Sequence, residues 1–390
     1  MKTKLITLPY SRQWIGEEEI AAVTAVLSEE RITQGPKIRE FEERFAEAVG
    51  ARYAVAVSSG TGALHLTALA LGLKQGDEVI TTPLSFLATA NAVLYTAAKP
   101  VFADVEPHTL CLNPEEVEKR VTPNTKAVLP VHFGGHPANL EALHRICEKF
   151  NLEMIEDGAH ALGAKYRDSS IGDCRYSKAV VFSFHPVKHI TTGEGGAITT
   201  NDPAFYERLC TLRSHGMIHD RSKFSQEDEG PWYYEMQELG FNYRITDIQA
   251  ALGMSQLKKL RAFVQRRREI AAQYEEGFEG VEEIQLPREA QGVLCSYHLY
   301  PIRLRLDRIR CSRRYLFEAL LEKGIGVQTH YIPIPKQPYY KRLGYSSECF
   351  PEAEKYYQEA ISLPLFPQMS ASDVRFVIRT LKDLIQDQRL

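Results

Sequence analysis

The chain has 390 residues, 44% of them hydrophobic, and a formal net charge of −3, so it can bury a sizeable core and lacks the basic excess of nucleic-acid-binding proteins. No apolar run approaches the ~20 residues of a membrane span, and the seven scattered cysteines contain no C-x-x-C pair of a zinc ribbon and no pattern of a disulfide framework. These features predict a soluble, cytoplasmic protein of two or three domains.

Short apolar runs alternate with helical segments through the first two thirds of the chain. Strands that alternate with helices form βαβ units, so this order predicts an α/β fold with a mostly parallel central sheet flanked by helices. The expected helices lie within 61–73, 85–98 and 139–150. The expected strands lie within 52–60, 77–83, 99–105, 126–133, 152–158 and 178–184.

The pattern changes after the long helical stretch "TDIQAALGMSQLKKLRAFVQRRREIAAQYEEGF" at 246–278. A strand-like run at 297–306, a helical run at 312–324 and a Pro-rich segment at 330–340 follow it. This order indicates a large domain over 1–250 and a smaller C-terminal α+β domain over 251–390. The basic run at 265–269 is interpreted as a solvated helix face, because such faces commonly carry both signs of charge.

The segment "SSGTGAL" at 58–64 follows an expected strand and opens an expected helix. Free amides at a helix N-terminus, together with the helix dipole, suit a phosphate. Gly60 and Gly62 allow close backbone approach, and Thr61 can add a hydroxyl group. The alternative is a plain strand-to-helix turn.

Two further segments place candidate side chains at strand ends. In "MIEDGAH", Asp157 and His160 follow an apolar run, and the carboxylate could pair with a cation such as a protonated pyridine nitrogen. The alternative is a helix cap or a surface acid. In "TTPLSFLATAN", Phe86 could stack on a flat ring, or it could be a core aromatic.

The stretch "FSFHPVKHITTGEGG" places Lys188 after a strand-like run and before a Gly-rich turn, with Ser183 five positions earlier. A buried lysine has a lowered pKa, and its amine forms Schiff bases with carbonyl compounds and with pyridoxal phosphate (PLP). Most lysines are surface residues, which is the alternative. One PLP molecule, however, would use all these segments, since it needs a phosphate site, a stacking partner and an acid for its ring nitrogen.

A metal site is not expected. His132 and His136 are four residues apart in "HFGGH", but this segment is no helix, so the two side chains would not share a face. They are interpreted as loop histidines.

Five stretches together resemble the DegT/DnrJ/StrS family of PLP-dependent nucleotide-sugar aminotransferases, which have the aspartate aminotransferase fold of type I. They are "SSGTGALHL", "TTPLSFLATAN", "IEDGAHALGAKY", "SFHPVKHITTGEGGAITTND" and "LGFNYRITDIQAALG". The resemblance runs from about residue 7 to the C-terminus.

The resemblance implies a role for each site residue. Lys188 would hold PLP as a Schiff base and then act as general acid and base, and Asp157 would keep the pyridine nitrogen protonated. Phe86 would stack on the ring, and His160, where many relatives carry Gln, would lie near the PLP hydroxyl. The phosphate would be bound by Gly60, Thr61 and Ser183, and by Asn242 from the other subunit of a homodimer with shared active sites.

Within the family, "LRSHGMIHD", "PWYYEMQELG" and "ISLPLFP" resemble the transaminases that make UDP-4-amino-4,6-dideoxy-N-acetyl-β-L-altrosamine for pseudaminic acid. The substrates would then be a UDP-linked 4-keto-6-deoxy-N-acetylhexosamine and an amino-acid donor, glutamate by family resemblance. Tyr10, His330 and Tyr331 are candidates for substrate contact. Dehydratases of the family carry histidine in place of the Schiff-base lysine, and here the histidine stands one place later, at 189.

Two other functions stay open. One is a different nucleotide-sugar 4- or 3-aminotransferase of the same family, which a panel of substrates would distinguish. The other is a non-catalytic sugar-nucleotide sensor, against which Lys188, Asp157 and Ser183 argue.

Overall fold

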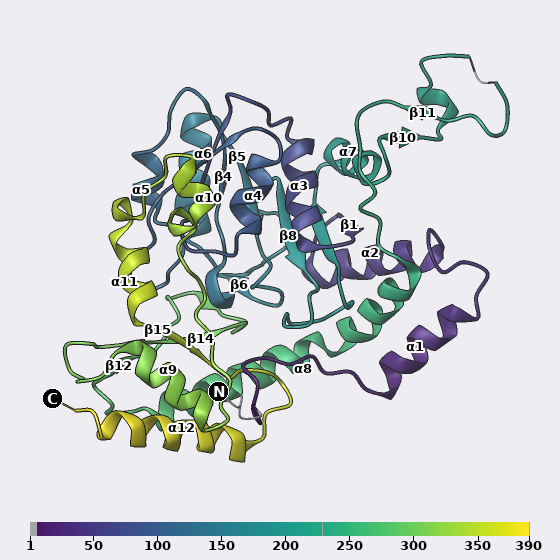
Figure 1. Ribbon diagram of the computed structural model, residues 1–390. Helices are drawn as coiled ribbons and strands as arrows, with labels where there is room; N and C mark the ends of the chain where they lie inside the picture. The colour runs from purple at the N-terminus through teal and green to yellow at the C-terminus, as the bar shows by residue number, and fades with distance from the viewer. Residues whose placement is uncertain (1–5, 228, 390) are drawn as a thin grey trace.

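A seven-stranded sheet in the order β1-β9-β8-β5-β4-β2-β3 forms the centre of the computed structural model, which describes residues 6–227 and 229–389 (Figure 1). From β8 to β3 neighbouring strands run parallel, whereas β9 is antiparallel to both β1 and β8. The expected mostly parallel sheet is confirmed, and the strand after the Gly-rich turn, β9, was not expected. The strands are β1 (Tyr53–Val57), β2 (Glu78–Thr81), β3 (Lys99–Phe102), β4 (Thr125–Leu129), β5 (Glu153–Asp157), β8 (Ala179–Ser183) and β9 (Gly196–Thr200).

Helices cover both faces of this sheet, because successive strand residues point to opposite faces. Ala54 and Ala56 pack into one hydrophobic cluster, and Val55 and Val57 pack into another. Helices α2 (Pro36–Val49), α5 (Pro114–Glu118) and α6 (Leu140–Phe150) contribute to the first cluster, and α3 (Gly60–Ala70), α4 (Ala88–Leu94) and α7 (Pro203–Arg213) to the second.

The long expected helix is confirmed as α8 (Asp247–Gly277). It begins at a capping box, in which Thr246 accepts a hydrogen bond from the Gln249 amide and Gln249 reaches back to the Thr246 amide. It runs from the large sheet to a small antiparallel sheet, β12-β14-β15 (Figure 1). That sheet and its helices are β12 (Ile284–Gln285), β14 (Tyr300–Leu304), β15 (Ala360–Leu363), α9 (Arg313–Glu322) and α12 (Ala371–Gln386).

The interpretation of 265–269 as a solvated face is wrong for Arg267, which is only 1% exposed. Its guanidinium donates hydrogen bonds to the carbonyl oxygens of Tyr297, His298 and Leu365. Mixed signs of charge along a helix do not show which side chains are buried. Arg267 faces inward, where backbone carbonyl oxygens accept the hydrogen bonds that water would otherwise accept.

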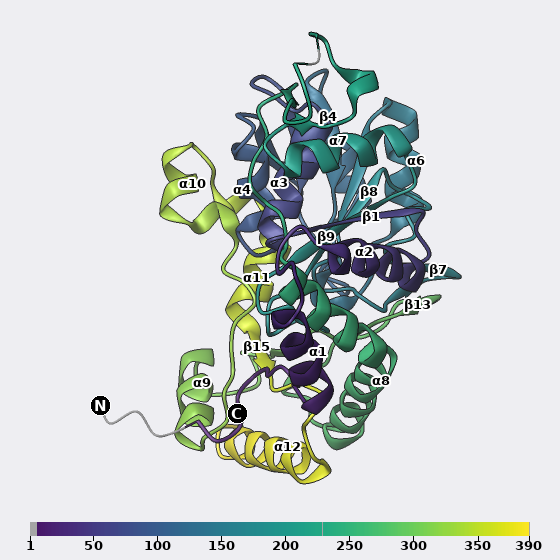
Figure 2. The same ribbon diagram turned by 90° about the vertical axis from the view of Figure 1, so that its right-hand side faces the viewer.

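The hydrophobic clusters connect distant parts of the chain. Leu8 packs with the small-sheet helices, while Tyr340 and Phe350 pack with the large sheet. Backbone bonds tie the N-terminal segment in place, from Gly326 to Leu8 at 2.7 Å and from Leu365 to Tyr10 at 3.0 Å. Figure 2 shows α10 projecting on the left, beyond α4, with α11 below it. The elements between α9 and β15 are η3 (Ile334–Lys336), α10 (Pro338–Arg342), η4 (Ser347–Cys349) and α11 (Pro351–Glu359). The division of the chain into two domains at residue 250 stays a prediction.

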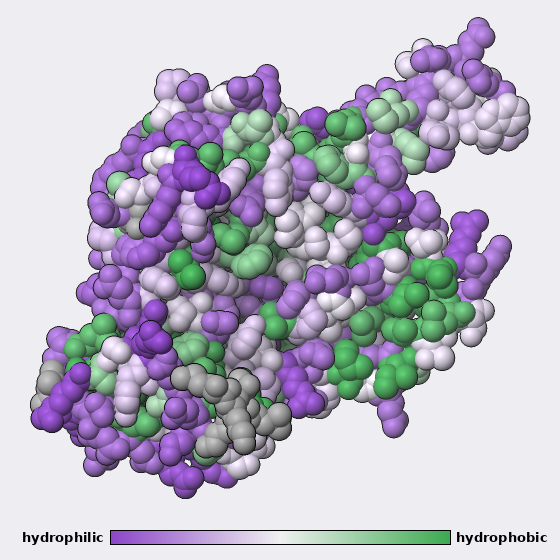
Figure 3. All heavy atoms as spheres, viewed as in Figure 1, coloured by the Kyte–Doolittle hydropathy of each residue, from purple (hydrophilic) through white to green (hydrophobic). Residues whose placement is uncertain are grey.

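Two surface features carry exposed apolar side chains. An arm made of β10 (Met217–Ile218), η2 (Arg221–Lys223) and β11 (Glu235–Met236) projects from the body (Figure 1), and Trp232 is 72% exposed on it. A second apolar area lies over α1 (Glu17–Leu27) and its flanks (Figure 3). It includes Trp14, Ile15, Ile20, Leu27 and Ile32.

A third small sheet joins β6 (Lys165–Tyr166), β7 (Ser169–Ser170) and β13 (Val293–Leu294).

Candidate active site

A cavity of about 410 Å³ lies where β5 and β8 end and α3 begins. In open α/β sheets, ligands bind at this edge, outside the carboxyl ends of the strands. Every residue predicted from the sequence for the site lines this cavity, except Gly62 and Asn242. They are Tyr10, Gly60, Thr61, Phe86, Asp157, His160, Ser183, Lys188, His330 and Tyr331.

Lys188 lies in the turn between β8 and β9, with its amine on the cavity wall. Its Nζ is 3.5 Å from Nε2 of His298. Burial lowers the pKa of Lys188 from the usual 10.5 to about 8, Asp157 opposes this and Arg267 adds to it. A larger fraction of this amine is therefore neutral at physiological pH than of an ordinary lysine, and a neutral amine is the nucleophilic form.

Asp157 ends β5 and is 4% exposed, so it is no surface acid. Thr89 donates to its Oδ2 at 2.7 Å, and the amide of Ala159 donates to its Oδ1 at 3.1 Å. Ser85 continues the chain with a hydroxyl 2.8 Å from that of Thr89. The carboxylate is thus fixed in one orientation at the cavity.

The N-terminus of α3 opens into the cavity beside the end of β8. Ser59 caps the helix by accepting a hydrogen bond from the Gly62 amide at 3.0 Å. A Cβ atom at Gly60 would lie 2.8 Å from Cβ of Ser183, so only glycine lets these two segments approach so closely. The start of α3 and the residues Thr61 and Ser183 then line the same space.

Aromatic and imidazole rings form the opposite wall. Tyr331 lies 6.2 Å from Phe86 between ring centroids, and its hydroxyl is 3.0 Å from Nε2 of His160. His330 bonds to the Ser362 hydroxyl and lies 5.5 Å from the Tyr10 ring. Phe86 is 57% exposed and is therefore not a core aromatic. Its ring is free to contact a flat ligand.

Burial keeps the histidines of this wall neutral. It lowers the pKa of His330 to about 3, and nearby Lys188 contributes to this shift. The pKa of His160 also falls well below its usual 6.5, for the same two reasons. Among the described residues, Nδ1 of His160 has no hydrogen-bond partner, which a bound ligand or water would supply.

Asn242 lies apart from the other predicted residues. Its side chain is exposed, and it pairs through the backbone with Ser214 at the base of the arm. It does not line the cavity of its own chain.

The pair His132 and His136 is buried and fully bonded within the protein. His132 bonds to Glu156 at 2.8 Å and to the Ala138 amide, and His136 bonds to the Pro137 carbonyl and the Ala290 amide. The segment between them forms one 3₁₀ turn, η1 (Phe133–Gly135), and no α-helix, as expected. Over the part of the chain that the structure describes, no three His, Cys, Asp or Glu side chains come together as a metal site requires.

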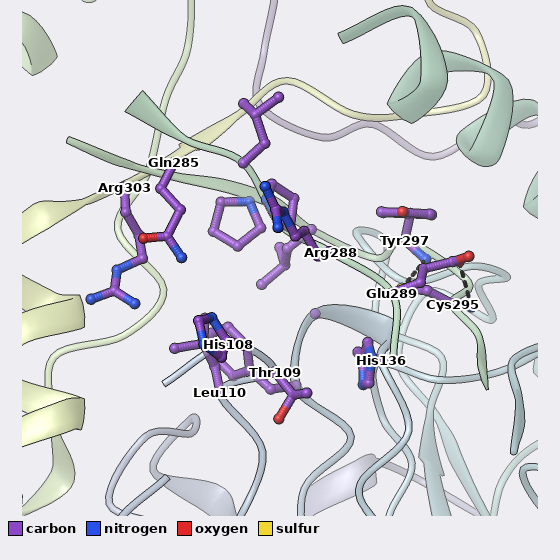
Figure 4. A pocket seen from close by; sticks show the side chains of 16 residues that line it. His108, Thr109, Leu110, His136, Gln285, Arg288, Glu289, Cys295, Tyr297 and Arg303 are labelled. Atoms are coloured by element: carbon purple, nitrogen blue, oxygen red, sulfur yellow. Dashed lines mark hydrogen bonds between the residues drawn. The ribbon is translucent and has the colours of Figure 1, made fainter. Parts of the chain in front are cut away.

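Figure 4 shows a second, smaller cavity of about 40 Å³, between His108, Gln285 and Glu289. Two of its charged groups are paired: Glu289 accepts from the Cys295 amide and from Arg268, and Arg303 pairs with Glu359. It has room for a few water molecules. A cofactor would not fit there.

Several residues of the site were not predicted from the sequence, and three of them bear on its chemistry. His298 and Thr89 line the cavity, and Arg267 lies behind Lys188. Nothing in the "SYHLYP" run before β14 marks His298 as different from a buried strand-end residue. The only sequence signal was in "TTPLSFLATAN", which supplied Phe86 and also contains Thr89.

Comparison with known proteins extends the similarity over nearly the whole chain. The sequence model of the DegT/DnrJ/EryC1/StrS aminotransferase family matches residues 13–382. The spore coat polysaccharide biosynthesis protein SpsC of Bacillus subtilis is 41% identical over 382 residues, which cover 97% of each chain.

Two solved structures are also similar. Helicobacter pylori PseC, an aminotransferase involved in the biosynthesis of pseudoaminic acid, has 33% identity and a TM-score of 0.90, with 97% of this chain and 99% of that chain covered. The sugar aminotransferase Spr1654 of Streptococcus pneumoniae in its PLP form has 29% identity and a TM-score of 0.90, with the same coverage. Within residues 6–227 and 229–389, every helix is too short or too polar to cross a membrane.

Proposed function

Since the chain belongs to the DegT/DnrJ/EryC1/StrS aminotransferase family and is a PLP-dependent sugar aminotransferase, we propose that it aminates a UDP-linked 4-keto-6-deoxy-N-acetylhexosamine. The donor would be L-glutamate, and the product the UDP-4-amino-4,6-dideoxy-N-acetyl-altrosamine of pseudaminic acid biosynthesis. The similarity to PseC supports this substrate. The comparable similarity to SpsC favours, as the second candidate, another nucleotide sugar of the same class.

The residues of the cavity fit PLP in size and chemistry. A volume of about 410 Å³ lies in the range of small-molecule sites. The close approach of Gly60 to Ser183 places the N-terminus of α3, where a helix favours a phosphate, beside the Ser183 side chain. Phe86 offers an exposed ring face, and Asp157 a buried carboxylate for the pyridine nitrogen.

We assign the covalent attachment of the cofactor to Lys188, whose lowered pKa of about 8 makes its amine available as a nucleophile. When bound, PLP withdraws electrons from the carbon that carries the amino group and so makes the proton on that carbon acidic. The freed Lys188 amine would accept that proton and return it to the neighbouring carbon. At a pKa of about 8 this amine can do both near neutral pH.

Asp157 would keep the pyridine nitrogen protonated. The hydrogen bonds from Thr89 and Ala159 hold the carboxylate oxygens, so they need no reorientation during the reaction. His160 and Tyr331 form a bonded pair next to it. We assign to this pair the contact with the cofactor's ring substituents, and to Tyr10 and His330 contact with the sugar.

We further propose a homodimer in which Asn242 completes the partner's site. Asn242 is exposed at the base of the projecting arm and does not reach the cavity of its own chain. The arm and α1 expose Trp232, Ile20 and Leu27, and exposed apolar side chains that gather on a surface are typical of interaction sites. A two-fold interface over these elements would cover that surface and bring Asn242 to the phosphate of the other subunit.

The placement of Lys188, Asp157, Phe86 and the α3 N-terminus around one cavity is the observation on which the reaction rests. Its test is incubation of the purified protein with L-glutamate and a panel of UDP-linked 4-keto-6-deoxy-N-acetylhexosamine isomers. Mass spectrometry and NMR identify any amino sugar formed. Amination of the altrosamine precursor alone supports the proposal, whereas exclusive amination of another isomer favours the second candidate. Lys188→Ala is the control that should form no product.

A further inference from the structure

His298 is the nearest hydrogen-bonding neighbour of the Lys188 amine. Its Nε2 lies 3.5 Å from Nζ, although the two residues are 110 positions apart in the chain. The ring is 3% exposed and lines the same cavity. A contact of this length is at the long limit of a hydrogen bond, and catalytic hydrogen bonds commonly shorten once the ligand is bound.

The backbone around His298 is held from two sides. Arg267 donates to its carbonyl oxygen at 3.3 Å, and the next amide, of Leu299, donates to Gly134 at 3.1 Å. Gly135, with φ +101°, allows this approach, because a Cβ atom at position 135 would lie 2.9 Å from the backbone nitrogen of His298. The ring is therefore placed by the fold and does not depend on a flexible loop.

The ring of His298 is neutral. Burial lowers the pKa of His298 well below 6.5, and the nearby Lys188 lowers it further. A neutral imidazole has one donor and one acceptor nitrogen. The Lys188 ammonium, the major form below its pKa of about 8, can only donate, so in that form Nε2 is the acceptor and Nδ1 carries the hydrogen. Among the described residues Nδ1 has no partner, so that donor remains for water or a ligand in the cavity.

We propose that His298 is a positioning residue for Lys188: its Nε2 accepts a hydrogen bond from the amine and orients it toward the reacting carbon. The inference rests on the proposed function, since it gives Lys188 the proton transfer. It adds to the assignment of Lys188 as the residue that binds the cofactor covalently, because it names the group that holds the amine after it is freed.

The charged and titratable groups that face Lys188 set the sign of the test. Asp157 stabilises the ammonium form, Arg267 destabilises it, and the neutral rings of His160, His189 and His330 lie around it. An acceptor at 3.5 Å also favours the ammonium, which is the stronger donor. Removing this acceptor should therefore lower the pKa of Lys188.

His189 provides a matched control. It is also 3% exposed and has a pKa well below its usual value, caused by burial first and Arg267 second. Its Nε2, however, bonds to the Ser296 carbonyl at 3.2 Å and not to the lysine. A variant of His189 loses a buried imidazole from the same region but keeps the acceptor of Lys188.

The experiment measures the pKa of Lys188 in the full-length apoprotein. Acetic anhydride labels neutral amines, and mass spectrometry of the peptide that contains Lys188 follows labelling against pH. In His298→Met and His298→Leu we expect the pKa to fall by about one unit, so that labelling at a pH below the pKa becomes about tenfold faster. His298→Gln, which keeps an acceptor, should restore the wild-type curve, and His189→Leu should match wild type.

Two apolar variants are measured together. If circular dichroism shows that one of them is misfolded, the other still tests the inference. Unchanged curves in either folded apolar variant overturn the inference, as does a shift of equal size in His189→Leu. In the PLP-bound enzyme, kcat should fall in the apolar variants by a larger factor than KM changes. In His298→Gln, kcat should recover. Borohydride reduction that fixes PLP to another lysine would refute the proposed function, whereas the labelling curves test His298 alone.

Discussion

The hydroxyl of Thr89 donates a hydrogen bond to Asp157 at 2.7 Å, and both side chains are buried. The bond joins the start of α4 to the end of β5, two elements on the wall of one cavity. A carboxylate held in this way keeps its negative charge at a fixed point. This arrangement suits an electronic role better than a role in binding affinity.

Asp157→Asn should therefore lose more turnover than PLP affinity. The amide keeps the shape but cannot hold a proton on the pyridine nitrogen. We expect kcat to fall by about 100-fold, which corresponds to about 2.7 kcal/mol in the barrier. Steady-state kinetics and a PLP titration by absorbance measure the two effects. Thr89→Val, which removes only the supporting bond, should cost about tenfold. Turnover of the Asn variant within a few-fold of wild type would contradict the role.

Lys188 should make the stability of the apoprotein depend on pH. The pKa of Lys188 is about 8 in the folded chain and 10.5 as the usual value. Below pH 8 the amine is charged in both states, and its burial lowers the free energy of unfolding. Between pH 8 and 10.5 the unfolded chain binds one more proton than the folded chain. The free energy of unfolding therefore rises by up to about 1.4 kcal/mol per pH unit, and the cost of burying the charge is lost.

Lys188→Met removes that cost at every pH. Urea unfolding of both apoproteins between pH 7 and 10.5 should show the variant more stable at pH 7 and the difference shrinking above pH 8. The comparison cancels the tyrosine and cysteine titrations common to both proteins. A difference that stays constant over this range would mean that the amine is not buried as described.

Gly60→Ala should weaken PLP binding through a steric effect. The added Cβ would lie 2.8 Å from Cβ of Ser183, so α3 would have to move away from β8. Overpacking of this kind costs about 1–3 kcal/mol. We expect at least a tenfold loss of PLP affinity in an absorbance titration. The double variant with Ser183→Gly removes the colliding atoms and should regain stability, while recovering affinity only in part, since the Ser183 hydroxyl is lost too.

A mixed dimer tests whether the sites are shared. One chain carries Lys188→Ala and the other Asn242→Ala. If Asn242 serves the partner's site, one site of the hybrid has both lesions and the other has none, so the hybrid should have close to half of wild-type activity. If Asn242 serves its own chain, every site keeps one lesion and activity does not recover.

The sequence predicted those parts of the fold and site that depend on local pattern. The strand ends at Asp157 and Ser183 follow from short apolar runs and turn residues, and α8 lies within the helical stretch expected at 246–278. The cavity wall at Phe86 and Lys188 was found because each lies in a recognisable motif.

What the sequence did not predict depends on long-range packing. His298 reaches Lys188 only because Arg267 and Gly134 hold its loop, and neither contact leaves a periodic signal. The burial of Arg267 was missed because acceptors for its guanidinium come from carbonyls 30 or more residues away. Backbone acceptors have no sequence signature, since every residue has one.

The contacts of the N-terminal segment affect the order in which a growing chain can become an enzyme. Tyr10 leaves the ribosome long before Gly326 and Leu365, yet these two residues hold its segment in place. His330 and Tyr331 also come late. A nascent chain that already contains Lys188 therefore has no enclosed cavity around it. Cofactor capture in the finished geometry has to wait until the segment that contains Leu365 has been made.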